Sequence, residues 1–216
     1  MKTHNVVLIS ALLTLAACGG GGGGGGSGSG GDREREREMT EATPGTYYTV
    51  LRPVNFHSNG FIPYGQATFT LENDQLQVNT SLDDDQPVKH RQTLHIGSRC
   101  PTSEDDTNGD SFIDYNEALK VVGKVLMPLD ADLNSQAGGE DIYPTGRSMS
   151  YSRMGVLSKI NADLKFPPGK GIGFEGRVVL IHGTSQNAFP TSLASLPGEP
   201  AHLSLPVVCG VLNKID

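Results

Sequence analysis

Short runs that alternate apolar with polar residues dominate the chain from Thr46 onward. This alternation is typical of β-strands, because successive side chains of a strand point to opposite faces of a sheet. Alternating or β-rich runs cover residues 46–54, 64–71, 75–82, 91–98, 156–166, 173–183 and 201–212. Asn73 and Asp74 separate the second run from the third and predict a hairpin turn. We therefore expect an all-β fold, an antiparallel barrel or sandwich.

Few segments depart from the strand pattern. Residues 115–126 place apolar side chains at three- and four-residue spacings, which predicts one short helix. "LDDDQ" (82–86) predicts an acidic turn, with a second ion site as its less favoured interpretation. "GKGIGFEG" (169–176) resembles a nucleotide loop, but it lacks the preceding apolar strand and following helix, and so predicts a turn.

The first 40 residues contribute little to a core. Lys2 and the apolar run 6–17 predict a signal segment, which is too short for a permanent membrane helix. Residues 19–31 are glycine and serine only, and predict a flexible tether with a reach of roughly 20 Å. Residues 32–39 alternate opposite charges and suit a solvated spacer or a partner helix. One β domain is then expected over 41–216.

The end of the signal segment carries a more specific pattern. "LAAC" (15–18) resembles the lipobox of bacterial lipoproteins. The resemblance implies a signal peptide over 1–17, a lipid on Cys18 and a tether over 18–40. Gly19, rather than an acid, implies the outer membrane, with the domain facing the periplasm or the cell surface. An ordinary secretory signal that contains a cysteine is the alternative.

The net charge of the chain limits the classes of molecule that it is expected to bind. Without the signal, the chain has 16 basic and 24 acidic residues, a net charge of −8. This balance argues against a nucleic-acid partner. The membrane would be reached through the lipid on Cys18, and the sequence identifies no protein partner.

Two cysteines remain if Cys18 carries a lipid. Cys100 and Cys209 form an even pair, as expected in an oxidising compartment. A disulfide between them would close a loop of about a hundred residues and stabilise the fold by about 4–5 kcal/mol. Two buried free thiols are the alternative.

"DTNGDSFIDYNE" (106–117) has the spacing of a calcium loop. An EF-hand loop of twelve residues takes its ligands from positions one, three, five, seven, nine and twelve. The ligands would be Asp106, Asn108, Asp110, the carbonyl of Phe112, Asp114 and Glu117. Ser111 replaces the glycine of position six, and "CPTSED" is too short for an entering helix. An acidic loop with Asp114 as N-cap and Glu117 as capping-box glutamate is the alternative. Calcium would bind this loop with low affinity and have a structural role.

Four fragments, in order, resemble the Cu/Zn superoxide dismutase family. They are "QTLHIG" (92–97), "RMGVLSKINAD" (153–163), "GRVVLIHG" (176–183) and "LPVVCGVL" (205–212). The resemblance implies a Greek-key β-barrel in which residues 101–126 form an EF-hand-like insertion. It also places Cys100 and Cys209 at the family's intrasubunit disulfide. An envelope fold of the chordin-repeat class is the main competitor.

Most of the metal-binding residues of this family are missing from the sequence. That site needs six histidines and an aspartate, whereas the mature chain has five histidines: His57, His90, His95, His182 and His202. His95 and His182 match copper ligands, but Gly97, Arg153, Val156 and Pro206 replace other functional residues. We therefore assign no catalytic or organic-cofactor residue and expect a binding or structural role. A superoxide dismutase-like or copper-binding protein using His95 and His182 is the alternative. For His95 and His182 we favour packing or hydrogen bonding on their strands over metal binding, and we expect His57, His90 and His202 in loops or at the surface.

Overall fold

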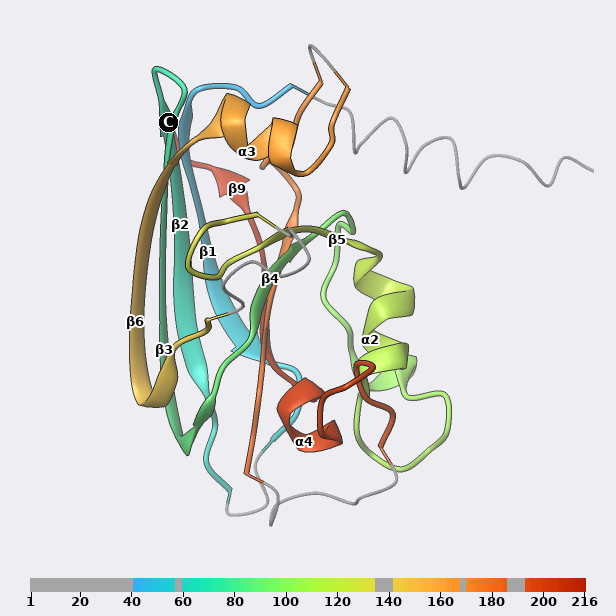
Figure 1. The fold of residues 1–216 in the computed structure, drawn as a ribbon. Helices are drawn as coiled ribbons and strands as arrows, with labels where there is room; N and C mark the ends of the chain where they lie inside the picture. Colours follow the sequence, from blue (N-terminus) through green and yellow to red (C-terminus); the bar gives the residue numbers. More distant parts are fainter. Residues whose placement is uncertain (1–40, 57–59, 135–141, 168–169, 186–192) are drawn as a thin grey trace, which may run out of the picture.

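The computed structural model describes residues 41–56, 60–134, 142–167, 170–185 and 193–216. The predicted signal, lipid site and tether, residues 1–40, lie outside these ranges. Within them, the strands form one curled antiparallel sheet, which confirms the all-β prediction (Figure 1). The strands are β1 (Gly45–Pro53), β2 (Tyr64–Glu72), β3 (Gln75–Lys89), β4 (Gln92–His95), β5 (Val125–Pro128), β6 (Thr145–Val156), β7 (Val178–His182), β8 (Pro206–Val211) and β9 (Asn213–Lys214). None of the helices described is long and apolar enough to cross a membrane.

The strand order is β5-β4-β7-β8-β1-β2-β3-β6, with β9 added beside β1. Strands far apart in sequence, such as β4 and β7 or β3 and β6, are therefore neighbours, as in a Greek-key fold. β1 links the two halves: seven residue pairs join it to β2, whereas only Arg52 and Pro53 pair with β8. The sheet consequently curls into a half-barrel whose rims are β5 and β6.

The turn between β2 and β3 follows the prediction. Asn73 and Asp74 have φ values of 49° and 65°, as a two-residue type I′ hairpin requires. The predicted turn at 82–86 is wrong, because β3 runs through it to Lys89. The register with β6 shifts between Asp83 and Val88, so the acidic run forms an irregularity in a long strand.

The helices differ more from the prediction. α2 (Tyr115–Val122) is confirmed but ends four residues early, at Gly123 (φ 69°), because the chain then enters β5. Residues 157–163 form helix α3 (Leu157–Asp163) rather than a strand. Val156 already pairs with Gln75, the first residue of β3, so no ladder partner continues. Two short helical turns, η1 (Ser103–Asp105) and α4 (Ala201–Ser204), were not predicted.

Two apolar clusters hold the domain together. The larger fills the inside of the curled sheet, where Phe174 packs on Tyr47 and Phe69 with ring centroids 5.5 Å apart. The smaller cluster joins α2 and its preceding loop to β7 and β8, and comprises Ile113, Ala118, Val122, Val178, Leu180 and Cys209. This second cluster fixes the predicted calcium loop to the sheet.

Candidate functional site

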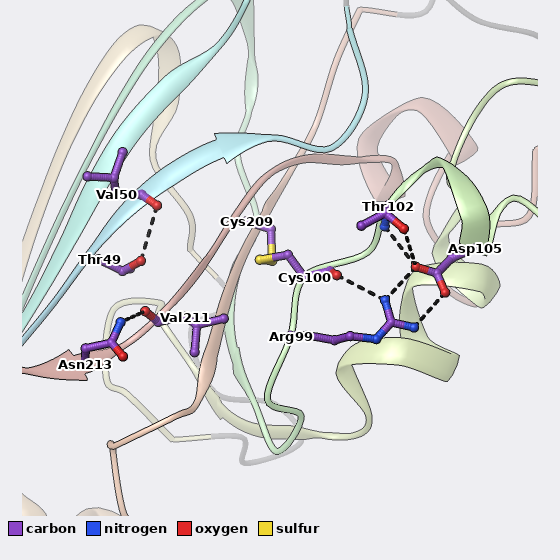
Figure 2. The surroundings of a disulfide bond; sticks show 9 residues. All are labelled: Thr49, Val50, Arg99, Cys100, Thr102, Asp105, Cys209, Val211 and Asn213. Carbon is purple, nitrogen blue, oxygen red and sulfur yellow. Dashed lines mark hydrogen bonds and ion pairs between the residues drawn. A yellow bond between two sulfur atoms is a disulfide. The ribbon is translucent and has the colours of Figure 1, made fainter.

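The disulfide anchors the start of the acidic loop. Cys100 and Cys209 are bonded, with their Cα atoms 5.8 Å apart, which confirms the predicted pair (Figure 2). Cys209 lies on β8 and Cys100 lies six residues before Asp106. The bond therefore ties the segment leading into the loop to the middle of the sheet.

An ion pair fixes the same segment. Arg99 contacts both carboxylate oxygens of Asp105, at 2.7 and 2.8 Å, and also donates to the carbonyl of Cys100 (Figure 2). Asp105 accepts a further bond from the backbone N–H of Thr102. The Arg99 guanidinium holds the pKa of Asp105 well below its usual range. A short 3₁₀ turn thus takes the place that an entering helix has in an EF-hand.

The first half of the loop bends around its own side chains. Asp106 accepts bonds from the N–H groups of Gly109 (2.7 Å) and Ser111 (2.8 Å). Asn108 accepts from Asp110 N–H, and Asp110 accepts from Phe112 N–H. The side chains at positions one, three and five therefore all turn toward the loop backbone.

Ser111 makes the sharp turn that a glycine usually makes at position six. Its φ is 71°, in the left-handed region, and Gly109 has a φ of 76°. A non-glycine residue there carries a backbone cost of about 1–2 kcal/mol. Glycine would remove this cost but lose about 0.5–1 kcal/mol in chain entropy.

We expect Ser111→Gly to raise the free energy of unfolding by about 0.5–1 kcal/mol, measured by urea denaturation. Gly109→Ala is the matched variant with the opposite sign. A Cβ on Gly109 would meet nothing within 4 Å, so its effect would come from the backbone alone. A loss of stability in Ser111→Gly would contradict this account of the turn.

Glu117 joins the two ends of the loop. One carboxylate oxygen accepts from the N–H and hydroxyl of Thr107, at 2.7 and 2.8 Å, and from Asn108 N–H at 3.2 Å. The other accepts from Asp114 N–H at 3.1 Å. Burial tends to raise the pKa of Glu117, but these hydrogen bonds outweigh it and the pKa is lowered. Glu117 is thus a buried anion that closes the loop.

Asp114 faces the helix rather than the loop. It is the N-cap of α2, accepting from Glu117 N–H at 2.9 Å, and its second oxygen accepts from Ala194 N–H at 3.3 Å. The capping box that we gave as the alternative to calcium binding is present. Asp106, Asn108 and Asp110 therefore lie together, Glu117 lies across the loop from them, and Asp114 is directed elsewhere. Within the residues described, no three acidic, histidine or cysteine side chains already converge as metal ligands do.

Asn55 is a residue that sequence reasoning missed. Its buried amide accepts from Ile113 N–H and donates to Ile113 C=O, both at 2.9 Å, and also donates to Pro206 C=O at 2.7 Å. It thus pairs the backbone of loop position eight to the start of β8. No local pattern around Asn55 predicts this, since 58 residues separate it from Ile113.

Asn55→Ala should leave three buried backbone groups without their partner. Each such group costs about 1–3 kcal/mol when water cannot replace it. We expect a fall in melting temperature of at least about 6–12 °C, measured by calorimetry. Asn55→Asp keeps the acceptor for Ile113 N–H but turns a buried carboxylate oxygen toward the carbonyls of Ile113 and Pro206, so it should be destabilised at least as much. An unchanged melting temperature in Asn55→Ala would contradict the role.

His95 is held by two protein groups. It is 1% exposed; its Nδ1 lies 2.8 Å from the Gly123 carbonyl, and its Nε2 lies 2.8 Å from the Thr93 hydroxyl. Since a carbonyl only accepts, Nδ1 carries the proton and Nε2 accepts from Thr93. Burial lowers the pKa of His95 to about 4, so the ring is neutral at pH 7. A metal on either nitrogen would have to displace a hydrogen bond.

His182 shares a sheet face with His95 but is not its neighbour. His95 of β4 pairs with Val178 of β7, whereas the backbone N–H of His182 donates to the carbonyl of Arg91. Arg91 lies four residues before His95 in the chain. Four residues span about 13 Å of extended strand. Two imidazoles that share one metal have nitrogens about 4 Å apart. The register therefore offsets the two histidines along the strands, although the charge of His95 contributes, after burial, to lowering the pKa of His182.

The other three histidines have separate outcomes. His90 lies in a loop, as predicted, but not at the surface, because it is fully buried, with Nε2 2.9 Å from the Gly146 carbonyl. It lies between β3 and β4, where the connection is only two residues long and remains inside the domain. His202 lies on α4 and is half-buried. His57 is outside the described residues.

The two buried neutral histidines should make stability fall in acid. Burial lowers the pKa of His182 to about 3 and that of His95 to about 4, from 6.5. The unfolded chain then binds more protons, so stability is full above about pH 6.5 and falls toward pH 4, by up to about 1.4 kcal/mol per pH unit for each histidine. Asp130 opposes this, because burial raises its pKa to about 6 and it adds stability as the pH falls.

Urea denaturation between pH 4 and pH 6.5 measures this slope. His95→Gln should reduce proton uptake on unfolding by about one, and adding His182→Gln by about one more. A slope that neither variant changes would contradict the neutral, buried state of these rings.

No family model matches the chain, and no curated protein matches it.

Proposed function

We propose that this chain is a lipid-anchored protein of the bacterial outer membrane, in which calcium held by residues 106–117 stabilises a β domain with a binding or structural role. The observation that carries the calcium proposal is the path of the loop. Asp106 draws in the N–H groups of Gly109 and Ser111, and Ser111 takes the left-handed turn that position six requires. The backbone thus bends as a calcium loop does despite the missing glycine.

The donor set suits calcium. Asp106, Asn108, Asp110 and Glu117 would supply hard oxygen ligands, together with the carbonyl of Phe112. Asp114 would act through a water, since its own oxygens bond Glu117 and Ala194. The carboxylate oxygens of Asp106 and Asp110 each accept one hydrogen bond and keep a second lone pair for a cation. Oε1 of Glu117 accepts three hydrogen bonds and would have to exchange some of them for the cation. Residues 106–117 hold four acids and no Lys or Arg, so a cation would also offset their mutual repulsion.

A superoxide dismutase-like fold is part of the proposal. The four resembling fragments fall on β4, β6 with α3, β7 and β8, and the disulfide ties the segment after β4 to β8. Arg153 and Val156, at positions where the family has metal ligands, are exposed on β6. Since function depends on the site and not on the fold, the proposed role is non-catalytic.

A copper-binding role remains the second candidate. One observation favours it: His95 and His182 lie on the same face of adjacent strands, β4 and β7. Two observations count against copper binding. The ring of His95 is already hydrogen-bonded to Thr93 and Gly123, and His95 and His182 are offset along their strands. The calcium proposal is therefore preferred.

Metal analysis of the purified lipidated protein separates the two candidates. After dialysis against a mixture of calcium, copper and zinc, we expect about one calcium per chain and no retained copper. One copper per chain, together with superoxide dismutation that His182→Ala abolishes, would establish the second candidate instead. Cys18→Ser tests the anchor separately: it should move the protein from the membrane fraction to the soluble fraction.

A further inference from the structure

The acidic loop contains one asparagine that is followed directly by glycine. Of the asparagines that the structure describes, only Asn108 precedes a glycine, since the other Asn-Gly pair of the chain, 59–60, begins outside the described residues. An asparagine loses ammonia when the next backbone nitrogen attacks Cγ, its side-chain carbonyl carbon. Glycine in the next position favours this attack, because it has no side chain to hinder the nitrogen. Residues 108–109 therefore have the sequence of a deamidation site.

The pair is accessible to solvent. Asn108 and Gly109 are both exposed, so the water that deamidation consumes can reach them. A Cβ built on Gly109 would meet nothing within 4 Å, which leaves the space around the attacking nitrogen open. Asn73 is also exposed and lies in a turn, but the next residue, Asp74, has a side chain. Asn73 is therefore the matched comparison within the same protein.

A base lies beside the attacking nitrogen. Oδ1 of Asp106 accepts the N–H of Gly109 at 2.7 Å, which is within the reach that a general base needs. A backbone amide nitrogen is a weak nucleophile while it keeps its proton, and an adjacent base activates it. The loop thus places a carboxylate at the proton that has to be removed.

Asp110 contacts both ends of the amide that is attacked. Its backbone N–H donates to Oδ1 of Asn108 at 2.8 Å. Negative charge develops on that oxygen as Cγ is attacked, and a fixed N–H donor stabilises it. The Asp110 carboxylate also accepts from Nδ2 of Asn108, the leaving nitrogen, at 3.1 Å. The nucleophile, the oxyanion and the leaving group therefore each have a partner within the loop.

We propose that Asn108 is a site of spontaneous deamidation through a cyclic imide with Gly109. Asp106 takes the proton of the Gly109 nitrogen, and this nitrogen forms a bond to Cγ of Asn108. The bond between Cγ and Nδ2 then breaks, and ammonia leaves with the proton that Asp106 had taken. Water opens the imide: attack on Cγ gives an aspartyl residue at position 108, and attack on the backbone carbonyl carbon gives an isoaspartyl residue. The net change is loss of ammonia and gain of water, which raises the mass by one unit.

A link to calcium rests on the proposed function of the loop. Calcium would bind Oδ1 of Asn108 and the carboxylate of Asp106, and so would occupy both the oxygen of the attacked amide and the base. Calcium should therefore slow the reaction. The aspartyl product would add a charged ligand at position three, whereas the isoaspartyl product would lengthen the backbone by one carbon and move the ligands on either side of it out of register. The calcium-free loop is thus the form that is modified.

Incubation of the full mature protein at mildly alkaline pH, in a chelator or in millimolar calcium, tests the proposal. After reduction of the disulfide, mass spectrometry of the tryptic peptide 100–120 measures the gain in mass and locates it. In the chelator, we expect the gain at Asn108 to be at least tenfold faster than at Asn73. An isoaspartyl methyltransferase should label part of the product. Calcium should slow the gain at Asn108 at least fivefold.

Two variants test the roles of the neighbouring groups. Gly109→Ala should slow the gain at least tenfold by hindering the nitrogen, and Asp106→Asn should slow it at least threefold by removing the base. Glu104→Gln, the same change of charge at an exposed position outside the loop, should leave the rate unchanged. Thermal melting verifies that each variant is folded.

Three outcomes would overturn the proposal: no gain at Asn108 in the chelator, a gain no faster than at Asn73, or a gain that neither Gly109→Ala nor Asp106→Asn slows. A gain in the chelator that calcium does not slow would support the modification site and count against calcium binding. The failure of one proposal is therefore distinguishable from the failure of the other.

Discussion

Replacing Cys100 and Cys209 together by alanine should lower the free energy of unfolding by about 4–5 kcal/mol. The bond closes a loop of 109 residues, and its loss frees the unfolded chain to adopt many more conformations. For a domain of this size, the melting temperature should fall by roughly 10–20 °C. Urea denaturation measures the first quantity and calorimetry the second.

The double variant is preferred because a single one leaves a reactive thiol. Reduction of the native protein should give a similar loss and provides the control for side-chain packing. Arg99→Ala is a second control, because it breaks the neighbouring ion pair with Asp105 and leaves the disulfide intact. Its effect should be within about 1 kcal/mol, since the arginine is largely exposed. A loss below about 1 kcal/mol in the double variant would show that the disulfide does not support the fold.

Calcium should have the second large effect. Modules outside the cell bind calcium with dissociation constants around 10⁻⁴–10⁻³ M. Calcium at about 10 mM should then add about 1.4–2.7 kcal/mol to the free energy of unfolding, by mass action on the folded state. This corresponds to a rise in melting temperature of roughly 3–10 °C, measured against the same protein in a chelator.

Glu117→Gln should abolish that rise, because it removes the charge of the bidentate ligand. It should also lower stability in the chelator, since the carboxylate accepts four hydrogen bonds across the loop. Glu104→Gln is the matched control: it changes the same charge two residues before the loop, at an exposed position. An equal calcium shift in Glu117→Gln and the native protein would contradict the proposed ligand.

Local patterns missed β5, β6 and β9 but predicted β1, β2, β3, β4, β7 and β8, because alternation is a property of each strand alone. Asn73 and Asp74 predicted the hairpin for the same reason. Residues 157–163 were mispredicted because the end of the ladder, and not their own sequence, decides their structure: Val156 is already paired with Gln75, the first residue of β3. Leu157 and Ile160 then bury their side chains from one helical face.

The candidate site likewise contains residues that the local sequence predicts and residues that only the tertiary fold brings together. The spacing of Asp106, Asn108 and Asp110 predicted a calcium loop, which stays a prediction, whereas the capping box of Asp114 and Glu117, given as the alternative, is present at the start of α2. Asn55 could not be predicted, since its bonds to Ile113 connect segments that only the tertiary fold brings together. His95 and His182 were paired by resemblance alone, and the register between β4 and β7 offsets them by four residues along the strands.

Isothermal titration of the mature protein with calcium tests the central claim most directly. The account predicts one site per chain, at least tenfold weaker in Glu117→Gln and in Asp106→Asn, and unchanged in Glu104→Gln. Absence of binding at millimolar calcium, or binding that neither loop variant weakens, would contradict it.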